Sequence, residues 1–490
     1  MRTAIWVESS AAIGDGHFFR CFNLAREFVR RKIEVVFVCN ELKHGHAQLV
    51  HDLGCRLIEI ASCENEIADA IAFLDAVASF EPEIVVVDSY QLRVDWESHV
   101  RSSIETLVVI ADLPDVKHSC DFIVDQNLTD RTAETWSHLA PGAKILIGPR
   151  YALLDSRINE RRRLKFDEKV VNENILVYFG GTNVVGILTK TVEALESIAT
   201  HSSPAYVVAH KEQWQEVVLN ISKPVNWCVH QEPNSFFVDL MDNASLAIGA
   251  GGSTVWERLC LGVDQTLISI ARNQEFGCVE LDRRDLATYL GDHEKVSTRE
   301  IRLAIENRIA ARAFPNTRVV EGQLLVDGFG SPRVVENILP TPAEEISIRR
   351  ATPKDAVLYF AWVNDQYVRS ASLSSSEIKW DEHLAWFNEK VDSDTSKMYV
   401  CLAGGLPIGQ VRFDFIDNQV ELDYSLDIDV RGRDWARVIL DLALHEFRAH
   451  SQEAVFATVR NQNARSISAL LKAGYAQISG DESSAVFSHT

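Results

Sequence analysis

The stretch that decides the fold begins Ala4-Ile5-Trp6-Val7 and continues, after a short loop, as Ile13-Gly14-Asp15-Gly16-His17-Phe18-Phe19-Arg20-Cys21. The apolar run, the glycine loop and the helical pattern that follows predict a strand, a tight turn and a helix. Gly14 and Gly16 allow a ligand to approach the backbone closely, which side chains there would block. His17 falls where converging N–H groups at a helix start disfavour imidazolium and keep the ring available as a base. Taken alone, the tetrapeptide Gly14-Asp15-Gly16-His17 is better explained as an ordinary strand-to-helix turn with a surface histidine.

Apolar strands recur along the first 160 residues with helical stretches between most of them, a pattern typical of a parallel sheet covered by helices on both faces. A charged, apolar-poor segment at 157–169 interrupts this pattern, and we interpret it as a linker or a solvated helix leading into a second unit. The alternation then restarts. The sequence therefore predicts an α/β protein with two doubly wound, Rossmann-like halves around a cleft, with ligands at the carboxyl ends of the strands. The predicted strands are Ala4–Val7, Val35–Val38, Arg56–Ile60, Ile84–Asp88, Leu107–Asp112, Phe122–Val124 and Lys144–Ile147, then Ile175–Phe179, Ala205–Ala209, Val225–Val229, Leu246–Ile248 and Gln265–Ile268.

Two glycine clusters follow strands of the second half: Gly180-Gly181-Thr182-Asn183 and Gly249-Ala250-Gly251-Gly252-Ser253-Thr254-Val255-Trp256-Glu257. In both, small residues end the strand and a helix begins with Ser or Thr, so free N–H groups and a hydroxyl can hold a pyrophosphate without a metal. Glu257, one turn into its helix, is placed to accept hydrogen bonds from ribose hydroxyls; alternatively it is solvated or complements the helix dipole. Neither a GxGxxG motif with a suitably spaced acid nor GxxxxGK[ST] occurs, which argues against NAD enzymes and P-loop ATPases.

Composition excludes several classes of partner. The formal net charge of −21 argues against a nucleic-acid or anionic-membrane surface, since both need a basic face. The nine cysteines form no CxxC pair, which indicates reduced, mostly buried thiols. No apolar run is long enough to span a bilayer. We therefore expect a cytoplasmic protein with no metal, membrane or nucleic-acid partner.

An ordered series of motifs carries a family resemblance over roughly residues 1–325. Gly14-Asp15-Gly16-His17-Phe18-Phe19-Arg20-Cys21, Asp88-Ser89-Tyr90, Gly148-Pro149-Arg150-Tyr151-Ala152-Leu153-Leu154, Gly180-Gly181-Thr182, the cluster from Gly249 to Glu257 and Asn273-Gln274 resemble the UDP-2,4-diacetamido-2,4,6-trideoxy-β-L-altropyranose hydrolases of pseudaminic acid biosynthesis. That family is similar in fold to GT-B glycosyltransferases, notably the enzyme that adds N-acetylglucosamine in lipid II synthesis.

The resemblance implies that His17 activates water, which attacks the anomeric carbon and expels UDP with inversion. A base for the water and stabilisation of the departing phosphate are what this bond cleavage requires, and UDP leaves without a protonating acid. The resemblance further implies that substrate or UDP is bound by Gly14, Gly16, Arg20, Asp88, Tyr90, Tyr151, Gly180, Gly181, Thr182, Gly251, Gly252, Ser253, Thr254, Glu257, Asn273 and Gln274. Departures from the family pattern at Ala111 in Ala111-Asp112-Leu113, at Asp125 and at Asn183 leave the identity of the sugar open.

The C-terminal stretch resembles a GNAT-type acetyltransferase, a mixed α/β fold, over roughly residues 346–480. Predicted strands Met398–Ala403, Ile408–Phe415 and Val420–Leu426 lead into the basic loop Val430-Arg431-Gly432-Arg433-Asp434-Trp435-Ala436 and a helix over Arg437–Ala449. Where such a strand ends its carbonyls splay, and the loop with the helix N–H groups can hold the pyrophosphate of acetyl-CoA. The resemblance implies acetyl-CoA, a co-substrate, bound by Arg431, Gly432, Arg433, Ala436 and Asn463.

Two departures affect the catalytic inference for this region. Asp434 stands where the family usually has glycine, and a carboxylate beside a pyrophosphate is repulsive unless it turns outward. Leu470 stands where the family often has a general-acid tyrosine. Glu421, Asp423 and Tyr424 are possible proton acceptors, although Glu421 and Asp423 fit an exposed strand face equally well.

The sequence thus predicts halves over 1–160 and 170–325, a linker over 326–345 and a GNAT-type domain over 346–490. The leading hypothesis is a bifunctional enzyme that N-acetylates a UDP-4-amino sugar and hydrolyses the product. The alternatives are a GT-B glycosyltransferase, a hydrolase of a related UDP-sugar with an inert GNAT-like domain, or a UDP-sugar-binding sensor. Glycosyl transfer needs an acceptor groove with an apolar or basic patch, and residues 1–160 contain no such run.

Overall fold

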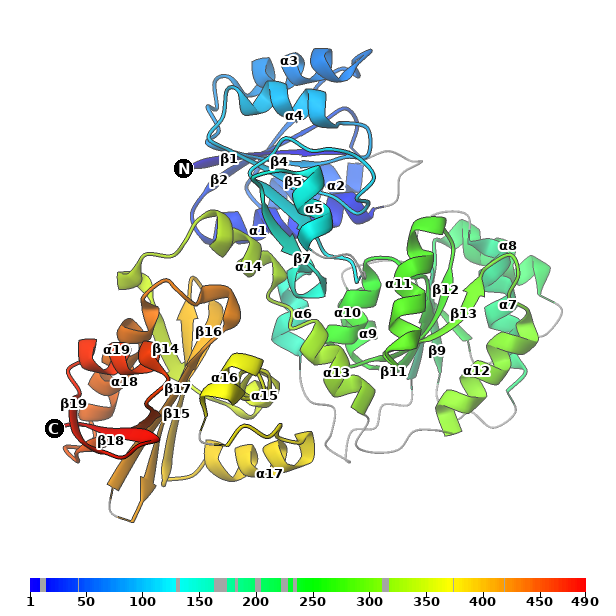
Figure 1. The fold of residues 1–490 in the computed structure, drawn as a ribbon. Coiled ribbons are helices and arrows are strands. Elements are labelled where there is room, and N and C mark those ends of the chain that lie inside the picture. The colour runs from blue at the N-terminus through cyan, green and yellow to red at the C-terminus, as the bar shows by residue number, and fades with distance from the viewer. Residues whose placement is uncertain are drawn as a thin grey trace. The chain divides into compact units, whose positions relative to one another are not determined.

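A computed structural model describes residues 1–8, 15–42, 44–128, 133–162, 174–180, 184–198, 204–221, 228–231, 236–310, 317–372, 374–417 and 419–490. The chain forms two compact units, Met1–Ile338 and Leu339–Thr490. The predicted fold class is confirmed, because the first unit contains two parallel sheets and the second a mixed sheet (Figure 1).

The first sheet is parallel and has the strand order β3-β2-β1-β4-β5-β6-β7. The seven predicted strands are all present, as β1 (Arg2–Val7), β2 (Glu34–Cys39), β3 (Arg56–Glu59), β4 (Ile84–Asp88), β5 (Thr106–Ile110), β6 (Phe122–Asp125) and β7 (Lys144–Ile147). Alternate residues face opposite helix layers, so Ala4 and Trp6 of β1 pack with Phe73 and Trp96 of α3 and α4. The helices are α1 (Gly16–Arg30), α2 (His44–Asp52), α3 (Glu66–Val77), α4 (Val94–Arg101), α5 (Ala133–Leu139) and α6 (Ser156–Arg161), with η1 at Pro149–Tyr151.

The second sheet is also parallel, with the order β10-β9-β8-β11-β12-β13. Its strands are β8 (Asn174–Tyr178), β9 (Ala205–Val208), β10 (Cys228–Gln231), β11 (Ala244–Gly249), β12 (Asp264–Ser269) and β13 (Thr288–Asp292). Separate apolar cores cover its two faces, one beneath α9 (Phe237–Asp242), α10 (Thr254–Cys260) and α11 (Arg272–Arg283), the other beneath α7 (Val185–Glu196), α8 (Lys211–Asn220) and α12 (Thr298–Ala310). β13 was not predicted, because its residues are all only half-buried and do not alternate. The start of the predicted strand Val225–Val229 lies outside the described residues.

The predicted linker over 326–345 is wrong in its first part. After α13 (Thr317–Leu325), the chain forms α14 (Gly330–Ile338), which packs against α1 of the first half (Figure 1). Val334 and Val335 of α14 are fully buried, and Glu336 accepts a hydrogen bond from Arg31 at 3.1 Å. Because α14 buries an apolar face on the first half, it belongs to the first unit. The other predicted boundaries remain predictions.

The second unit has a sheet in the order β14-β15-β16-β17-β18-β20-β19. Neighbouring strands are antiparallel except β17 and β18, which are parallel. The predicted strands appear as β15 (Ser396–Ala403), β16 (Leu406–Ile416) and β17 (Gln419–Leu426). The remaining elements are β14 (Ser347–Arg350), α15 (Ala356–Val363), α16 (Gln366–Ala371), α17 (Trp380–Val391), α18 (Trp435–Arg448), β18 (Val455–Arg460), α19 (Ala464–Lys472), β19 (Ala476–Gly480) and β20 (Ser484–His489), with short 3-10 turns at Ala343–Glu345, Pro353–Asp355 and Ile428–Val430.

Candidate functional site

Each parallel sheet has one point at which the strand order reverses, and the predicted motifs lie at these two points. In the first sheet β1 lies between β2 and β4, with Val7 beside Asp88. In the second sheet β8 lies between β9 and β11, with Tyr178 beside Gly249. Loops that leave the carboxyl ends of such strand pairs diverge and open a crevice in which ligands bind. The fold therefore provides two candidate ligand positions within the first unit.

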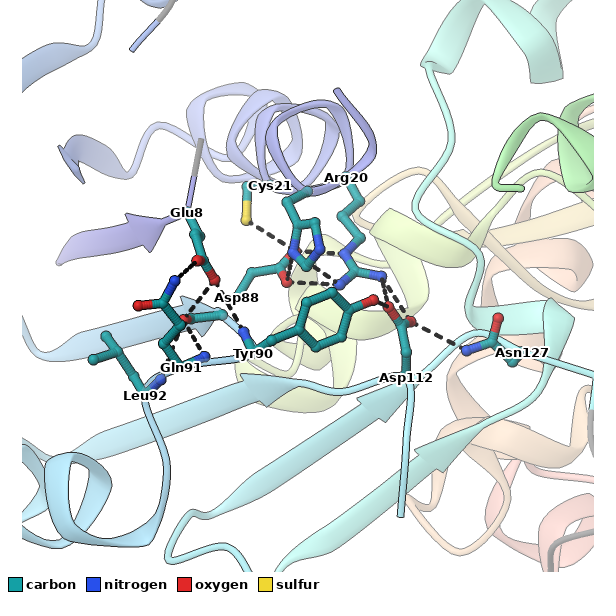
Figure 2. Close-up of polar contacts among 11 residues, drawn as sticks. Glu8, Arg20, Cys21, Asp88, Tyr90, Gln91, Leu92, Asp112 and Asn127 are labelled. Carbon is teal, nitrogen blue, oxygen red and sulfur yellow. Dashed lines mark hydrogen bonds and ion pairs between the residues drawn. The ribbon is translucent and has the colours of Figure 1, made fainter. Parts of the chain in front are cut away.

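The first position is built around His17, which lies in the first turn of α1. Its Nδ1 is 2.6 Å from Oδ1 of Asp88, the last residue of β4. Asp88 is fully buried and also accepts hydrogen bonds from Nε and Nη2 of Arg20 (Figure 2). Burial would raise the pKa of Asp88, but the Arg20 guanidinium and His17 hold it well below its usual range. An ionised Asp88 orients the His17 ring through Nδ1 and leaves Nε2 for other chemistry.

Arg20 connects Asp88 to a second carboxylate, Asp112. Nη1 of Arg20 donates to both carboxylate oxygens of Asp112, at 2.7 and 2.9 Å. Asp112 also accepts the Tyr90 hydroxyl at 2.7 Å and the Asn127 amide at 3.1 Å (Figure 2). Two carboxylates around one guanidinium leave a net charge of about −1, so a proton on His17 would make the cluster neutral. We call His17, Arg20, Asp88, Tyr90 and Asp112 the His17 network.

Glu8, at the end of β1, fixes the turn that carries Tyr90. Its carboxylate accepts hydrogen bonds from the Ser89 hydroxyl at 2.8 Å, the Tyr90 N–H at 3.0 Å and the Gln91 amide at 2.7 Å. The Tyr90 ring consequently meets the His17 ring edge-on, with 4.7 Å between the ring centres. A cavity of about 340 Å³ lies beside Glu8, lined in part by Trp6, Asn40 and Leu92. The turn after β4 thus joins this cavity to the His17 network.

Sequence reasoning missed Glu8 as a site residue, named Asp112 only beside the departing Ala111, and treated Asp125 only as a departure from a family pattern. Glu8 directly follows β1 and Asp112 lies two residues after the end of β5, so the rule that chemistry lies at the carboxyl ends of parallel strands could have found both. Asp125 has a supporting part: it is fully buried and accepts hydrogen bonds from Asn127 and from the Trp136 indole at 3.0 Å. Burial raises the pKa of Asp125 to about 6.

The second position is the loop of residues 249–254 between β11 and α10. A Cβ on Gly251 would lie 2.2 Å from Sγ of Cys278 and 3.3 Å from Cβ of Gln274, so only glycine lets this loop pack on α11. Ser253 precedes α10, and its hydroxyl makes no capping hydrogen bond. A Cβ on Gly16 would lie 3.9 Å from that hydroxyl, which places the first residue of α1 close to this loop.

The structure brings only some of the predicted residues of this position together. Gln274 lies against Gly251 and Gly252, and its side chain accepts a hydrogen bond from the Ile270 N–H at 3.1 Å. Thr254 begins α10, Asn273 is exposed in the first turn of α11, and Tyr151 has the Arg333 guanidinium 6.0 Å from its ring centre. Gly180 follows β8 with φ at +94°, a left-handed conformation that suits glycine. Gly14, Gly181 and Thr182 lie outside the described residues.

Glu257 is half-buried on α10. Burial, with a contribution from Asp155, raises its pKa to about 7, and Arg258 and Arg157 oppose the shift. A carboxyl group that titrates near neutral pH in a crevice is a candidate ligand contact. Within the described residues, no group of His, Cys, Asp and Glu side chains is arranged to hold a metal ion.

In the second unit, β17 and β18 pair only at Val420 with Val455 and Glu421 with Phe456, so β17 runs on to Leu426 without this partner. This divergence matches the predicted splayed strand. The loop that follows turns at Gly432, with φ at +88°, and at Asp434, with φ at +59°. Asp434 precedes α18 but caps none of its N–H groups. Its carboxylate instead accepts a hydrogen bond from Lys472 at 2.8 Å.

The predicted acetyl-CoA-binding residues differ in whether their polar groups already have partners within the protein. Arg431 donates to Asp365 at 2.7 Å and to the Leu426 carbonyl at 3.1 Å, and it lies 5.3 Å from the Tyr367 ring centre. The Asn463 side chain accepts a hydrogen bond from the Ser466 N–H, which caps α19. Arg433 stacks over Trp435, and Ala436 lies in the first turn of α18. The side chains of Arg431 and Asn463 thus already have hydrogen-bond partners, whereas backbone N–H groups at the start of α18 have no side-chain cap.

The possible proton acceptors lie on β17. Glu421 is exposed, Asp423 accepts a hydrogen bond from Gln410 at 2.6 Å, and the Tyr424 hydroxyl is 2.8 Å from that of Ser466. Leu470 is fully buried on α19. All nine cysteines are free thiols, and all but Cys63 are buried. No helix within the described ranges has the length and apolar character needed to cross a membrane.

Comparison with known proteins agrees with this architecture. Residues 345–476 match the family model described as an acetyltransferase (GNAT) domain. The uncharacterized protein MJ1062 of Methanocaldococcus jannaschii is 20% identical over 401 residues, which cover 79% of this chain and 78% of that protein. The spore coat polysaccharide biosynthesis protein SpsG of Bacillus subtilis is 20% identical over 351 residues, 71% of this chain and all of SpsG. The crystal structure of Acinetobacter baumannii MurG is similar with a TM-score of 0.50 at 11% identity, covering 69% of this chain and 98% of MurG.

These similarities define the class of protein. The likeness to MurG confirms the predicted GT-B-like fold, and the family match shows a GNAT acetyltransferase domain near the C-terminal end. The chain therefore joins a GT-B-like fold, distantly similar to a polysaccharide biosynthesis protein, to a GNAT domain.

Proposed function

We propose that the first unit hydrolyses a UDP-sugar and that the second N-acetylates the amino group of its precursor. The sugar proposed is 2,4-diacetamido-2,4,6-trideoxy-β-L-altropyranose, which the family resemblance names. The observation that carries the hydrolase proposal is the hydrogen bond between His17 and the buried, Arg20-paired Asp88. In this arrangement Asp88 accepts the Nδ1 proton, so Nε2 carries the lone pair that takes a proton from water.

The charge of the His17 network supports base catalysis. Proton transfer from water turns His17 into an imidazolium, and Asp88 lies 2.6 Å from its Nδ1 to stabilise that charge. Arg20 is buried and both its carboxylate partners are in the network, so it acts as a positioning residue for Asp88. This assignment differs from the predicted substrate-binding role of Arg20 and Asp88. Tyr90 is 39% exposed and borders His17, so it remains available to the sugar.

The second position suits UDP. Attack of water on the anomeric carbon forms one C–O bond, breaks the bond to the diphosphate and inverts the configuration. The leaving diphosphate carries the charge that must be stabilised, and the N–H groups and the Ser253 hydroxyl of loop 249–254 can donate to it. Glu257 would accept hydrogen bonds from ribose hydroxyls. We propose that this reaction proceeds without a metal.

Acetyl-CoA fits the second unit as a co-substrate. The edge of β17 beyond Glu421 is free of β18, which leaves backbone groups for the pantetheine chain. The uncapped start of α18 and the turn at Gly432 offer N–H groups to the pyrophosphate. A neutral amine would attack the acetyl carbonyl, forming the amide as the thiol of CoA leaves. Asp423 and Tyr424 on β17 remain candidates for taking the amine proton.

The test uses the full-length protein and NMR. With the diacetamido UDP-sugar alone, we expect UDP and a free sugar whose first-formed anomer is inverted. With the UDP-4-amino sugar and acetyl-CoA, we expect the acetylated sugar and one equivalent of free CoA thiol. His17→Asn should stop sugar release without changing CoA release, and His138→Asn, on the exposed face of α5, is the matched control. Sugar release that requires an added acceptor alcohol would instead establish a glycosyltransferase.

A further inference from the structure

Arg258 lies beneath the loop of residues 249–254. Its side chain is only 2% exposed and extends back from α10 toward the start of that loop. Nη2 donates to the Ala250 carbonyl at 2.8 Å and Nε donates to the Thr254 carbonyl at 3.1 Å. A Cβ on Gly249 would lie 2.6 Å from Nη1, so glycine at this position leaves room for the guanidinium. One buried cation thus holds both ends of the loop.

The charge of Arg258 has no direct counterion among the described residues. Two other buried arginines of this unit differ: Arg20 pairs with Asp88 and Asp112, and Arg333 pairs with Asp327. Glu257 is adjacent in sequence but forms no ion pair with Arg258 within 4 Å. Burial lowers the pKa of Arg258 to about 10, which still leaves it protonated at neutral pH. A buried charge without a partner is unfavourable, so a fold that retains one has a use for an anion at that position.

We infer that Arg258 is the positive charge that holds the diphosphate of the nucleotide at loop 249–254, acting from beneath the backbone. This inference rests on the proposed function, which locates UDP at the loop. The carbonyls of Ala250 and Thr254 take the guanidinium N–H groups, so Arg258 acts through the loop rather than by touching the phosphate. Its charge would be felt through a low-dielectric interior, where salt screens it weakly.

The consequence is a preference that depends on ligand charge. Uridine is neutral, UMP carries about two negative charges and UDP about three, and all three share the same nucleoside. If Arg258 serves the diphosphate, its removal should weaken binding in proportion to ligand charge. If Arg258 only braces the loop, its removal should weaken all three ligands by the same factor.

The experiment measures dissociation constants of the full-length protein for uridine, UMP and UDP by calorimetry, with a thermal melt for every variant. We expect Arg258→Gln to weaken UDP about 10- to 30-fold and UMP less, while uridine changes less than about twofold. Arg258→Lys, which keeps the charge, should retain most of the preference for UDP over uridine. Arg283→Gln removes an exposed arginine of the same half and should change none of the three constants.

Three outcomes separate the possibilities. Equal weakening of all three ligands in Arg258→Gln, or unchanged UDP binding, would overturn the inference and leave the proposed function standing. Loss of the UDP preference in Arg258→Lys would also overturn it, and this variant decides the matter if Arg258→Gln does not fold. A wild-type protein that binds UDP no better than uridine would overturn the proposed function and the inference together.

Discussion

The His17 network and the loop before α18 both place arginines beside carboxylates, but they differ in what the pairing leaves available. In the network, Arg20 is paired with Asp88 and Asp112. His17 donates through Nδ1 to Asp88, and its Nε2 has no hydrogen bond to any described residue. In the loop, Arg431 is paired with Asp365 and Asp434 is paired with Lys472. The groups that remain for a ligand are the backbone N–H groups at the start of α18, which have no side-chain cap. The first site is therefore suited to side-chain chemistry and the second to backbone recognition of a co-substrate.

Removing the imidazole of His17 from the first site has the largest expected effect. His17→Asn should lower turnover of the UDP-sugar by about two to four orders of magnitude, the usual contribution of a general base. UDP affinity should stay within about twofold, because loop 249–254 is untouched. Steady-state kinetics and calorimetry check the two quantities. Lost UDP affinity with preserved turnover of bound substrate would make His17 a binding residue and remove the contrast between the sites.

Breaking the ion-pair network should cost stability as well as activity. Arg20→Leu leaves the buried Asp88 and the half-buried Asp112 without their guanidinium, a change that costs about 3–5 kcal/mol. Arg101→Leu, which breaks a partly exposed ion pair with Asp121 in the same half, should cost about 0–1 kcal/mol. Urea unfolding of both variants measures the difference. Similar losses in the two variants would show that the network contributes no more than a surface pair.

The pH dependence of this loss has a defined sign. In the wild type, the depressed pKa of Asp88 contributes stability that is present above the pKa of the unfolded carboxyl and lost only in strong acid. In Arg20→Leu, only His17 still opposes the effect of burial on Asp88, so we expect the pKa of Asp88 to rise and protonation to stabilise the folded variant. The gap between variant and wild type should narrow as pH falls from about 8 to about 5.5. A difference in stability between variant and wild type that widens as pH falls would contradict the pairing of Arg20 with an ionised Asp88.

Sequence predicted the features that depend on residues close together in the chain, and it missed those that depend on residues far apart in the chain. Strand runs such as Ala4–Val7 depend on neighbours in the chain, so pattern alone predicted them. The role of Arg20 depends on Asp88 and Asp112, which are 68 and 92 residues away and meet it only because β4 and β5 lie beside β1 in order. The residues of α14 were predicted to be linker because Val334 and Val335 become buried only when α14 packs against α1. The same limit hid the engagement of Arg431 by Asp365.

Glu257 offers a test of the UDP position with an intermediate effect. Its pKa of about 7 means that the carboxylate able to accept ribose hydroxyls is lost as pH falls from about 8 to about 6. UDP affinity should therefore drop by up to about tenfold over that range. Glu257→Gln should bind UDP weakly at both pH values, and the ratio of wild type to variant cancels the titration of UDP itself. A ratio that does not change with pH would exclude Glu257 from the contact.

The smallest effect is expected at Asp434, and it tests whether the second site recognises its ligand through the backbone. Asp434→Gly would tighten acetyl-CoA binding strongly if the carboxylate faced the pyrophosphate. Because Lys472 holds the carboxylate at 2.8 Å, we expect the dissociation constant to fall by no more than about threefold. Asp434→Asn separates charge from backbone, since asparagine also tolerates the left-handed conformation at φ +59°. Calorimetry with acetyl-CoA should give both variants constants near the wild type, whereas a tenfold gain in both would mean that Asp434 faces the pyrophosphate after all.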